Sequence, residues 1–196
     1  MLYHKDFKIN YWLPPRTASR MTKEMLLVVG FEGFTSNYHD LVIYDNSWDL
    51  IVNVRNPYSA YLSAYHTVSH NKTQTFKEYL DLANENHMMG KFLDHWDVGS
   101  ALKRYNLIPN KIVRYENLQE DILSLDFIKC NLLNLESLID KLKEGKKPWR
   151  EHYSEIANQP YHTFYNQELA DIVWERKKHS FELLGYDRDS WKTIID

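Results

Sequence analysis

The chain has 196 residues, of which 43% are hydrophobic and 14% aromatic, and its formal net charge is −3. This composition excludes an intrinsically disordered chain, because enough apolar surface is present to form a core. The small negative charge argues against a general nucleic-acid-binding protein, for which a basic domain is expected. We therefore expect a single domain that covers residues 1–196.

The cysteine content and the N-terminal sequence predict a cellular location. The chain has one cysteine, Cys130, which excludes an internal disulfide. Its apolar, helical surroundings predict a small buried residue rather than a nucleophile. The N-terminus has no basic region followed by an apolar one, and no run of residues is long enough to cross a bilayer. We expect a cytoplasmic protein that does not bind a membrane.

The first predicted elements are a strand, a loop and a helix. Residues 8–13 alternate and favour β-structure, and an apolar stripe with helical spacing predicts a helix over residues 19–28. Thr17 and Ser19 are good N-cap residues. A helix N-terminus attracts phosphate or sulfate, and Arg16 and the two hydroxyl groups can assist. The loop between strand and helix is therefore predicted to bind an anion; it reads Pro14-Pro15-Arg16-Thr17-Ala18-Ser19-Arg20.

This loop differs from the phosphate-binding loop of nucleotide triphosphatases. That loop requires G-x-x-x-x-G-K-[ST], whereas no glycine occurs here between Ile9 and Val29 and no lysine occurs at the helix entry. A nucleotide or small-molecule kinase built on a related sheet nevertheless stays open as an alternative, because it would also need two anion-binding loops.

A second anion-binding element follows a short, β-branched run, Leu50–Val54, which predicts a buried strand. Asn56-Pro57 ends the strand, and Pro57 opens a helix near residues 58–69. Helical side chains lean toward the N-terminus, so Ser63 can reach a ligand that Arg55 holds. The planar fork of arginine suits a phosphate, but a structural ion pair would explain Arg55 equally well.

The later elements complete an α/β pattern. We predict a third strand near residues 111–114 and helices near residues 75–84, 135–144 and 167–184, with Gly185 ending the last one. The three strands would form a central, mostly parallel sheet flanked by helices. Ligands in such sheets bind at the carboxyl ends of the strands, where Arg16 and Arg55 would meet.

The two anion-binding elements together resemble the PAPS-dependent sulfotransferases, and most closely the carbohydrate-type enzymes. In that family a strand-loop-helix binds the 5′-phosphosulfate. Residues 16–20 are similar to its K-[TG]-G-[ST]-[TR] loop, with Arg16 for lysine and Ala18 for glycine. Arg16 keeps the positive charge that stabilises the bridging oxygen. Alanine at this position implies a backbone without a positive φ.

The family's second element, R-x(7)-S, binds the 3′-phosphate. Arg55 and Ser63 match it at full spacing, although Ser59 and Ala60 replace the usual acidic and arginine residues. Further similarities follow in the family's order along the chain: they are Asp94-His95-Trp96, residues 111–118, residues 164–169 and residues 181–187.

The resemblance implies a fold and a reaction. The fold would be a P-loop-like single α/β domain. PAPS would be the cofactor, adenosine 3′,5′-bisphosphate its product, and the acceptor a hydroxyl or amine of a small molecule or glycan. Family members carry a catalytic histidine or glutamate between the two elements, so His39 is the candidate base, and Glu32 and His95 are its competitors.

The sequence also bears on a catalytic metal, on loss of activity and on a late basic segment. The one H-x-x-x-H spacing joins His66 and His70 and lacks the glutamate of a zinc-protease H-E-x-x-H motif, and no C-x-x-C occurs, so we expect no catalytic metal. A catalytically silent relative that binds sulfated or phosphorylated ligands stays open, because of the substitutions in both motifs. A basic segment would either close over the nucleotide or, as we prefer, form a solvated helix end; it comprises Lys141, Lys143, Lys146, Lys147 and Pro148-Trp149-Arg150.

Overall fold

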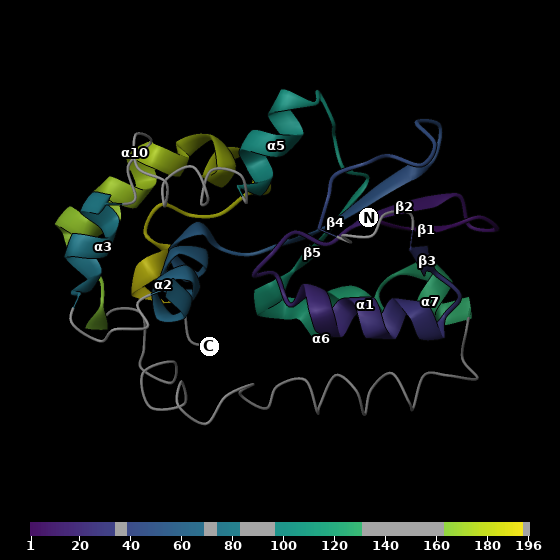
Figure 1. The fold of residues 1–196 in the computed structure, drawn as a ribbon, viewed down its shortest axis with the longest axis horizontal. Helices are drawn as coiled ribbons and strands as arrows, with labels where there is room; N and C mark the ends of the chain where they lie inside the picture. Colours follow the sequence, from purple (N-terminus) through teal and green to yellow (C-terminus); the bar gives the residue numbers. More distant parts are fainter. Residues whose placement is uncertain (34–38, 69–73, 83–96, 131–162, 194–196) are drawn as a thin grey trace. The chain divides into compact units, whose positions relative to one another are not determined.

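The computed structural model describes residues 1–33, 39–68, 74–82, 97–130 and 163–193 (Figure 1). The chain divides into two compact units. The first unit takes its residues from 1–54 and 108–148, and the second from 55–107 and 149–196. That the chain forms a single domain stays a prediction.

The first unit contains a mixed five-stranded sheet with the strand order β3-β1-β2-β4-β5. Strands β2, β4 and β5 run parallel, whereas β1 is antiparallel to both β2 and β3. The three parallel strands are those predicted from the sequence, and the two antiparallel ones were missed. The strands are β1 (Leu2–His4), β2 (Ile9–Trp12), β3 (Glu32–Gly33), β4 (Asp49–Val54) and β5 (Lys111–Arg114).

Alternation along β2 assigns its side chains to two faces of the sheet. Tyr11 belongs to the apolar core that includes α1 (Ser19–Val28), and Asn10 and Trp12 bond to the segment 39–48 on the other face. Two short helices contribute to the same core as α1 and run beside it in Figure 1. They are α6 (Leu118–Leu123) and α7 (Asp126–Cys130), and a 3₁₀ turn, η1 (Tyr115–Asn117), precedes α6.

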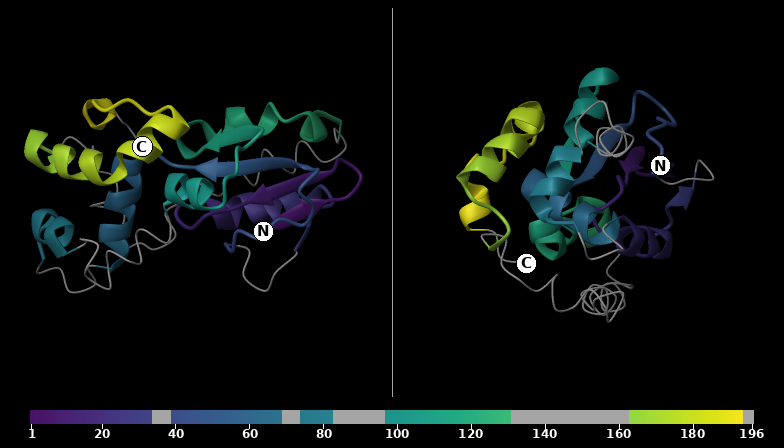
Figure 2. Two further views of the ribbon diagram at one scale, coloured as in Figure 1. Left: turned by 90° about the horizontal axis from the view of Figure 1, so that it is seen from above. Right: turned by 60° about the vertical axis from the view of Figure 1, so that its left-hand side comes forward.

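The second unit is helical. Its core joins buried aromatic and aliphatic side chains of α2, α3 and α10. Asn166 caps α10, since its side chain accepts a hydrogen bond from the N–H of Leu169 at 2.9 Å, and Gly185 ends the helix with φ 71°. The helices are α2 (Pro57–Val68), α3 (Phe76–Leu82), α5 (Val98–Arg104) and α10 (Gln167–Leu184), followed by a 3₁₀ turn, η5 (Ser190–Lys192). Figure 2 shows them from two further directions.

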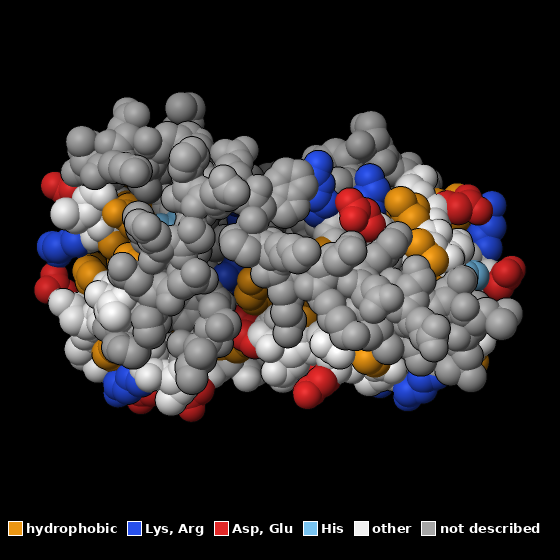
Figure 3. Space-filling view, turned by 90° about the horizontal axis from the view of Figure 1, so that it is seen from below, with side chains coloured by type: hydrophobic (Ala, Val, Ile, Leu, Met, Phe, Trp, Pro, Cys, Tyr) orange, Lys and Arg blue, Asp and Glu red, His pale blue; other side chains and the backbone are white. Residues whose placement is uncertain are grey.

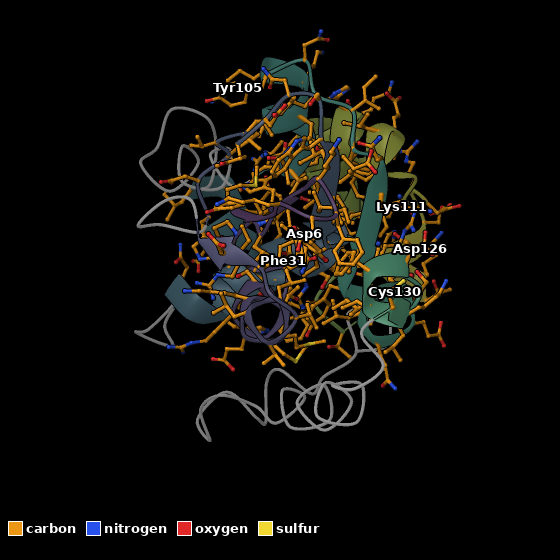
Figure 4. The ribbon with its side chains drawn as sticks, turned by 90° about the vertical axis from the view of Figure 1, so that its right-hand side faces the viewer. Asp6, Phe31, Tyr105, Lys111, Asp126 and Cys130 are labelled. Carbon is orange, nitrogen blue, oxygen red and sulfur yellow. The ribbon has the colours of Figure 1, made fainter. Side chains whose placement is uncertain are left out.

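Four of the five predicted helices are confirmed within one to two residues. The fifth, near residues 135–144, lies outside the described residues. The prediction for Cys130 is wrong, because this residue is exposed. It is the last residue of α7, where Phe127 and Ile128 supply the buried side chains, and Figure 4 shows its position at the surface.

The surface carries charges of both signs. On the face shown in Figure 3, the basic side chains of the described residues are scattered among acidic ones. In the part of the chain that the structure describes, no helix is long and apolar enough to cross a membrane.

Candidate functional site

The loop between β2 and α1 has an unusual backbone. Arg16 and Ala18 have φ angles of 69° and 57°, in the left-handed region, with Thr17 between them. Alternation of this kind turns successive N–H groups toward one concavity, which is how backbone nests bind anions. The expectation that Ala18 avoids a positive φ is therefore wrong: the loop keeps the conformation that glycine favours, with alanine in it.

The side chains of the loop differ in what they offer. Ala18 is the N-cap residue of α1, in place of the predicted Thr17 or Ser19, and has no side chain to accept a hydrogen bond from the helix. Thr17 is buried and donates its hydroxyl proton to the carbonyl oxygen of Pro14 at 2.7 Å. The hydroxyl proton of Thr17 is thus used in a hydrogen bond within the loop and is not available to donate to a ligand. Ser19 is buried as well, and Arg20 is exposed.

We expect Ala18→Gly to stabilise the protein by about 0.5–1 kcal/mol. A left-handed conformation costs an L-residue about 1–2 kcal/mol, and the greater freedom of glycine in the unfolded chain offsets part of the gain. Urea unfolding monitored by circular dichroism measures this difference.

Ala60→Gly is the matched control, because Ala60 lies within α2, where glycine is expected to cost about 1 kcal/mol. Destabilisation of both variants by a similar amount would contradict the left-handed assignment.

His39 lies at the entrance of the loop. Its Nδ1 is 2.7 Å from the carbonyl oxygen of Leu13, and the backbone carbonyl oxygen of His39 accepts from the indole N–H of Trp12 at 2.7 Å. Because a carbonyl oxygen only accepts, Nδ1 carries the proton and the neutral ring has its lone pair on Nε2. The carbonyl of Leu13, not the adjacent Asp40, orients the ring.

The surroundings of His39 favour its neutral form. Burial lowers the pKa of His39 from its ordinary value, and the positive charges of the N-terminus and Arg16 lower it further. The hydrogen bond to Leu13 and the charge of Asp40 raise the pKa by less. The bond to Leu13 places this imidazole beside the residue that precedes the loop, within the first unit.

The two competing bases are less well placed or not described. Glu32 is exposed on β3, an edge strand that β1 separates from β2. It accepts a hydrogen bond from the hydroxyl of Tyr3, which raises the pKa of Tyr3 to about 12. His95 lies outside the described residues, as does the basic segment 141–150.

The second anion-binding element belongs to the second unit. Arg55 donates through Nε to the hydroxyl of Ser59, which is buried. Ser59 and Ser63 are four residues apart and so share one face of α2. Asn56 caps the same helix, with its Oδ1 accepting from the N–H of Tyr58 at 3.0 Å. The Ser59 hydroxyl thus holds Nε of Arg55 on the helix face that also carries Ser63.

The predicted residues fall into two groups. The loop residues 14–20 and His39 lie in the first unit, and Arg55 and Ser63 lie in the second. In the first unit β2 and β4 end at the same edge of the sheet, since Trp12 pairs with Val52. The meeting of Arg16 and Arg55 at one rim stays a prediction.

Sequence reasoning missed Asn53. It lies on β4, is fully buried, and hydrogen-bonds to the loop through its side-chain amide. The signal was present, because a single polar residue interrupts the apolar run from Leu50 to Val54 and must find partners when buried.

Within the described ranges, no group of three or more histidine, cysteine, aspartate or glutamate side chains could hold a metal ion. No family model matches the chain, and neither a curated protein nor a solved structure does.

Proposed function

We propose that the protein is a PAPS-dependent sulfotransferase that moves a sulfuryl group to the hydroxyl or amine of a small-molecule or glycan acceptor. The observation that carries the proposal is the pairing of the left-handed loop at residues 16–18 with a neutral histidine at its entrance. The sequence resemblance assigns a phosphosulfate to such a loop and a base to this interval. A P-loop-like fold is part of the same proposal.

The loop offers hydrogen-bond donors and positive charge, both of which a phosphosulfate group requires. The first turn of α1 offers backbone N–H groups, and the helix dipole adds positive potential. PAPS would supply the sulfuryl group together with a phosphate leaving group. Arg16 would stabilise the negative charge that develops on the oxygen between phosphorus and sulfur.

His39 would take the proton of the acceptor. As the acceptor oxygen bonds to sulfur and the bond from sulfur to the bridging oxygen breaks, the hydroxyl proton would pass to Nε2. The hydrogen bond from Nδ1 to Leu13 holds the tautomer in which Nε2 can accept it. Because the pKa of His39 is lowered, the imidazole is mostly in its neutral form at pH 7, the form that can act as a base.

Arg55 and Ser63 would bind the 3′-phosphate. A guanidinium pairs well with a phosphate in two-point contacts, and Ser59 restrains the Arg55 side chain by accepting from Nε. A restrained arginine loses less entropy on binding than an unrestrained one. A hydroxyl at position 59 also leaves the charge of the guanidinium intact, whereas the acidic residue usual in the family would partly neutralise it.

The test is calorimetric titration with adenosine 3′,5′-bisphosphate, ATP and adenosine 5′-phosphate. We expect the bisphosphate to bind at least about tenfold more tightly than the other two, and Arg55→Ala to weaken it by about 10–100-fold, the loss typical of a charged hydrogen bond. Arg104→Ala, at the end of α5, is the control and should leave the affinity within about twofold.

The other outcomes separate the alternatives. ATP binding equal to or tighter than that of the bisphosphate would favour the kinase. Tight bisphosphate binding without turnover of any acceptor would favour the catalytically silent relative. No binding of any of the three nucleotides would overturn the proposal.

A further inference from the structure

Asn53 occupies a position where a polar side chain is costly. It is the penultimate residue of β4 and has no exposed surface. It belongs to the sheet face that carries Tyr11 and Ile51, toward α1, where the neighbouring side chains form the apolar core. A buried amide is tolerated there only if its hydrogen bonds are made inside the protein.

The Asn53 amide makes three hydrogen bonds. Its Nδ2 donates to the carbonyl oxygen of Thr17 and to the hydroxyl of Thr22, both at 2.9 Å. Its Oδ1 accepts from the hydroxyl of Tyr11 at 2.8 Å. The carbonyl of Thr17 only accepts, so Nδ2 must face it and the orientation of the amide is fixed. Burial raises the pKa of Tyr11, which keeps its hydroxyl protonated as the donor.

The bond to Thr17 determines the orientation of a loop peptide group. In a trans peptide the C=O of one residue and the N–H of the next point in opposite directions. Because the Thr17 carbonyl points at the buried Asn53, the Ala18 N–H points away from Asn53. We propose that Asn53 is a positioning residue of the anion-binding loop, whose amide holds the Ala18 N–H toward a bound phosphate or sulfate.

The next peptide group is held by the same network. The carbonyl oxygen of Ala18 accepts from the N–H of Thr22 at 3.1 Å and from its hydroxyl at 3.2 Å. The Ser19 N–H therefore points out of the N-terminus of α1, opposite to that carbonyl. Asn53 bonds to the Thr22 hydroxyl as well, so one amide from β4 supports two successive loop peptide groups.

This inference rests on the proposed function of residues 14–20 as a phosphosulfate loop. Its distinctive consequence is that losing Asn53 weakens anion binding beyond its effect on stability. Asn10 is a close comparison: it is equally buried on β2, and its side chain bonds to the backbone of Asp45 and Tyr44. It faces the other side of the sheet from the loop.

The experiment is an NMR titration of ¹⁵N-labelled protein with inorganic pyrophosphate and, separately, with adenosine 3′,5′-bisphosphate. We expect the Ala18 and Ser19 amide resonances to shift in the wild type. Asn53→Ala should raise the Kd for pyrophosphate about tenfold and reduce the shift at Ala18. Asn10→Ala should leave this Kd within about twofold at a similar loss of thermal stability. Tyr11→Phe keeps the ring in the core and, by loosening Asn53, should raise the Kd about threefold.

The pyrophosphate measurements separate the inference from the proposed function. An unchanged Kd in folded Asn53→Ala, or in Tyr11→Phe where Asn53→Ala does not fold, would overturn the positioning role. A loss of affinity in Asn10→Ala as large as in Asn53→Ala would do the same. Pyrophosphate binding that depends on Asn53, without preference for the bisphosphate, would reject the sulfotransferase and support the inference. Absence of pyrophosphate binding to the wild type would overturn the inference, and absence of binding of both pyrophosphate and the bisphosphate would overturn the proposed function as well.

Discussion

Replacing His39 by glutamine is expected to lower the turnover of sulfuryl transfer by about 10²–10⁴-fold, the range typical for the loss of a general base. Glutamine can still donate a hydrogen bond to the carbonyl of Leu13, but it has no basic nitrogen to accept the acceptor's proton. Transfer from radiolabelled PAPS to a mixture of monosaccharides and small phenols measures the effect. The affinity for adenosine 3′,5′-bisphosphate should stay within about twofold.

The pH dependence of turnover gives an independent readout of the same residue. Burial lowers the pKa of His39 below its ordinary value of 6.5, so the imidazole loses its proton at a lower pH than in a peptide. Because only the neutral form accepts a proton, kcat/KM should rise with pH through a midpoint below 6.5 and become level at higher pH. In His39→Gln this rising limb should be absent.

His179→Gln is the control for this prediction, because it replaces a histidine of α10 in the second unit. It should keep both the rate and the pH profile of the wild type. Wild-type turnover in His39→Gln would exclude His39 as the base and leave Glu32 and His95 as candidates.

The sequence predicted the elements that have a local signature. Strands β2 and β4 and helices α1, α2, α3 and α10 carry enough apolar residues to be recognised from their pattern. Strand β5 was predicted from the resemblance of residues 111–118 to a sulfotransferase segment. Strands β1 and β3 have three and two residues, and their pairing depends on partners elsewhere in the sheet. Helices α6 and α7 have six and five residues, too few to show a helical period. Helix α5 is as long as α3 but has Gly99 and Ser100 in its first turn, which are weak helix formers.

The sequence suggested candidate site residues but not the backbone conformation and hydrogen bonds that position them. The resemblance to the sulfotransferases proposed Arg16 and Ala18 from the loop motif and His39 from its place between the two anion-binding elements. The left-handed conformation of Ala18 and the orienting carbonyl of Leu13 depend on hydrogen bonds between residues far apart in the sequence. The hydrogen bond from Asn53 to the carbonyl oxygen of Thr17 likewise joins residues that are 36 positions apart in the sequence. Propensity and periodicity describe near neighbours and cannot give such contacts.

A buried ion pair in the second unit was missed for the same reason. Lys177 of α10 has its Nζ 3.3 Å from Oδ2 of Asp97, the N-cap residue of α5, and both side chains are less than a tenth exposed. The hydroxyl groups of Ser100 and Ser180 also donate to this carboxylate. Gly99 permits the close approach of the two helices, because a Cβ there would lie 2.3 Å from the Ser180 hydroxyl oxygen.

Lys177→Met is expected to destabilise the protein by about 3–5 kcal/mol, because it leaves the Asp97 carboxylate buried without its counter-charge. The double variant Asp97→Asn with Lys177→Met should recover most of this loss, since it removes both charges and keeps similar volumes. Urea unfolding of the wild type, both single variants and the double variant gives the coupling energy between the two positions.

An exposed ion pair of α10 provides a comparison that shows how much burial adds to the stability loss at Lys177. Lys77 of α3 and Glu168 at the start of α10 are 2.7 Å apart, closer than the buried pair, but both side chains are more than half exposed. Because water screens this pair, Lys77→Met should destabilise the protein far less than Lys177→Met. Similar losses in Lys77→Met and Lys177→Met would show that the buried pair does not hold α5 against α10. A large loss at Lys177 that the double variant does not restore would show that the lysine contributes through its packing on Tyr61, whose ring centroid lies 6.0 Å from Nζ.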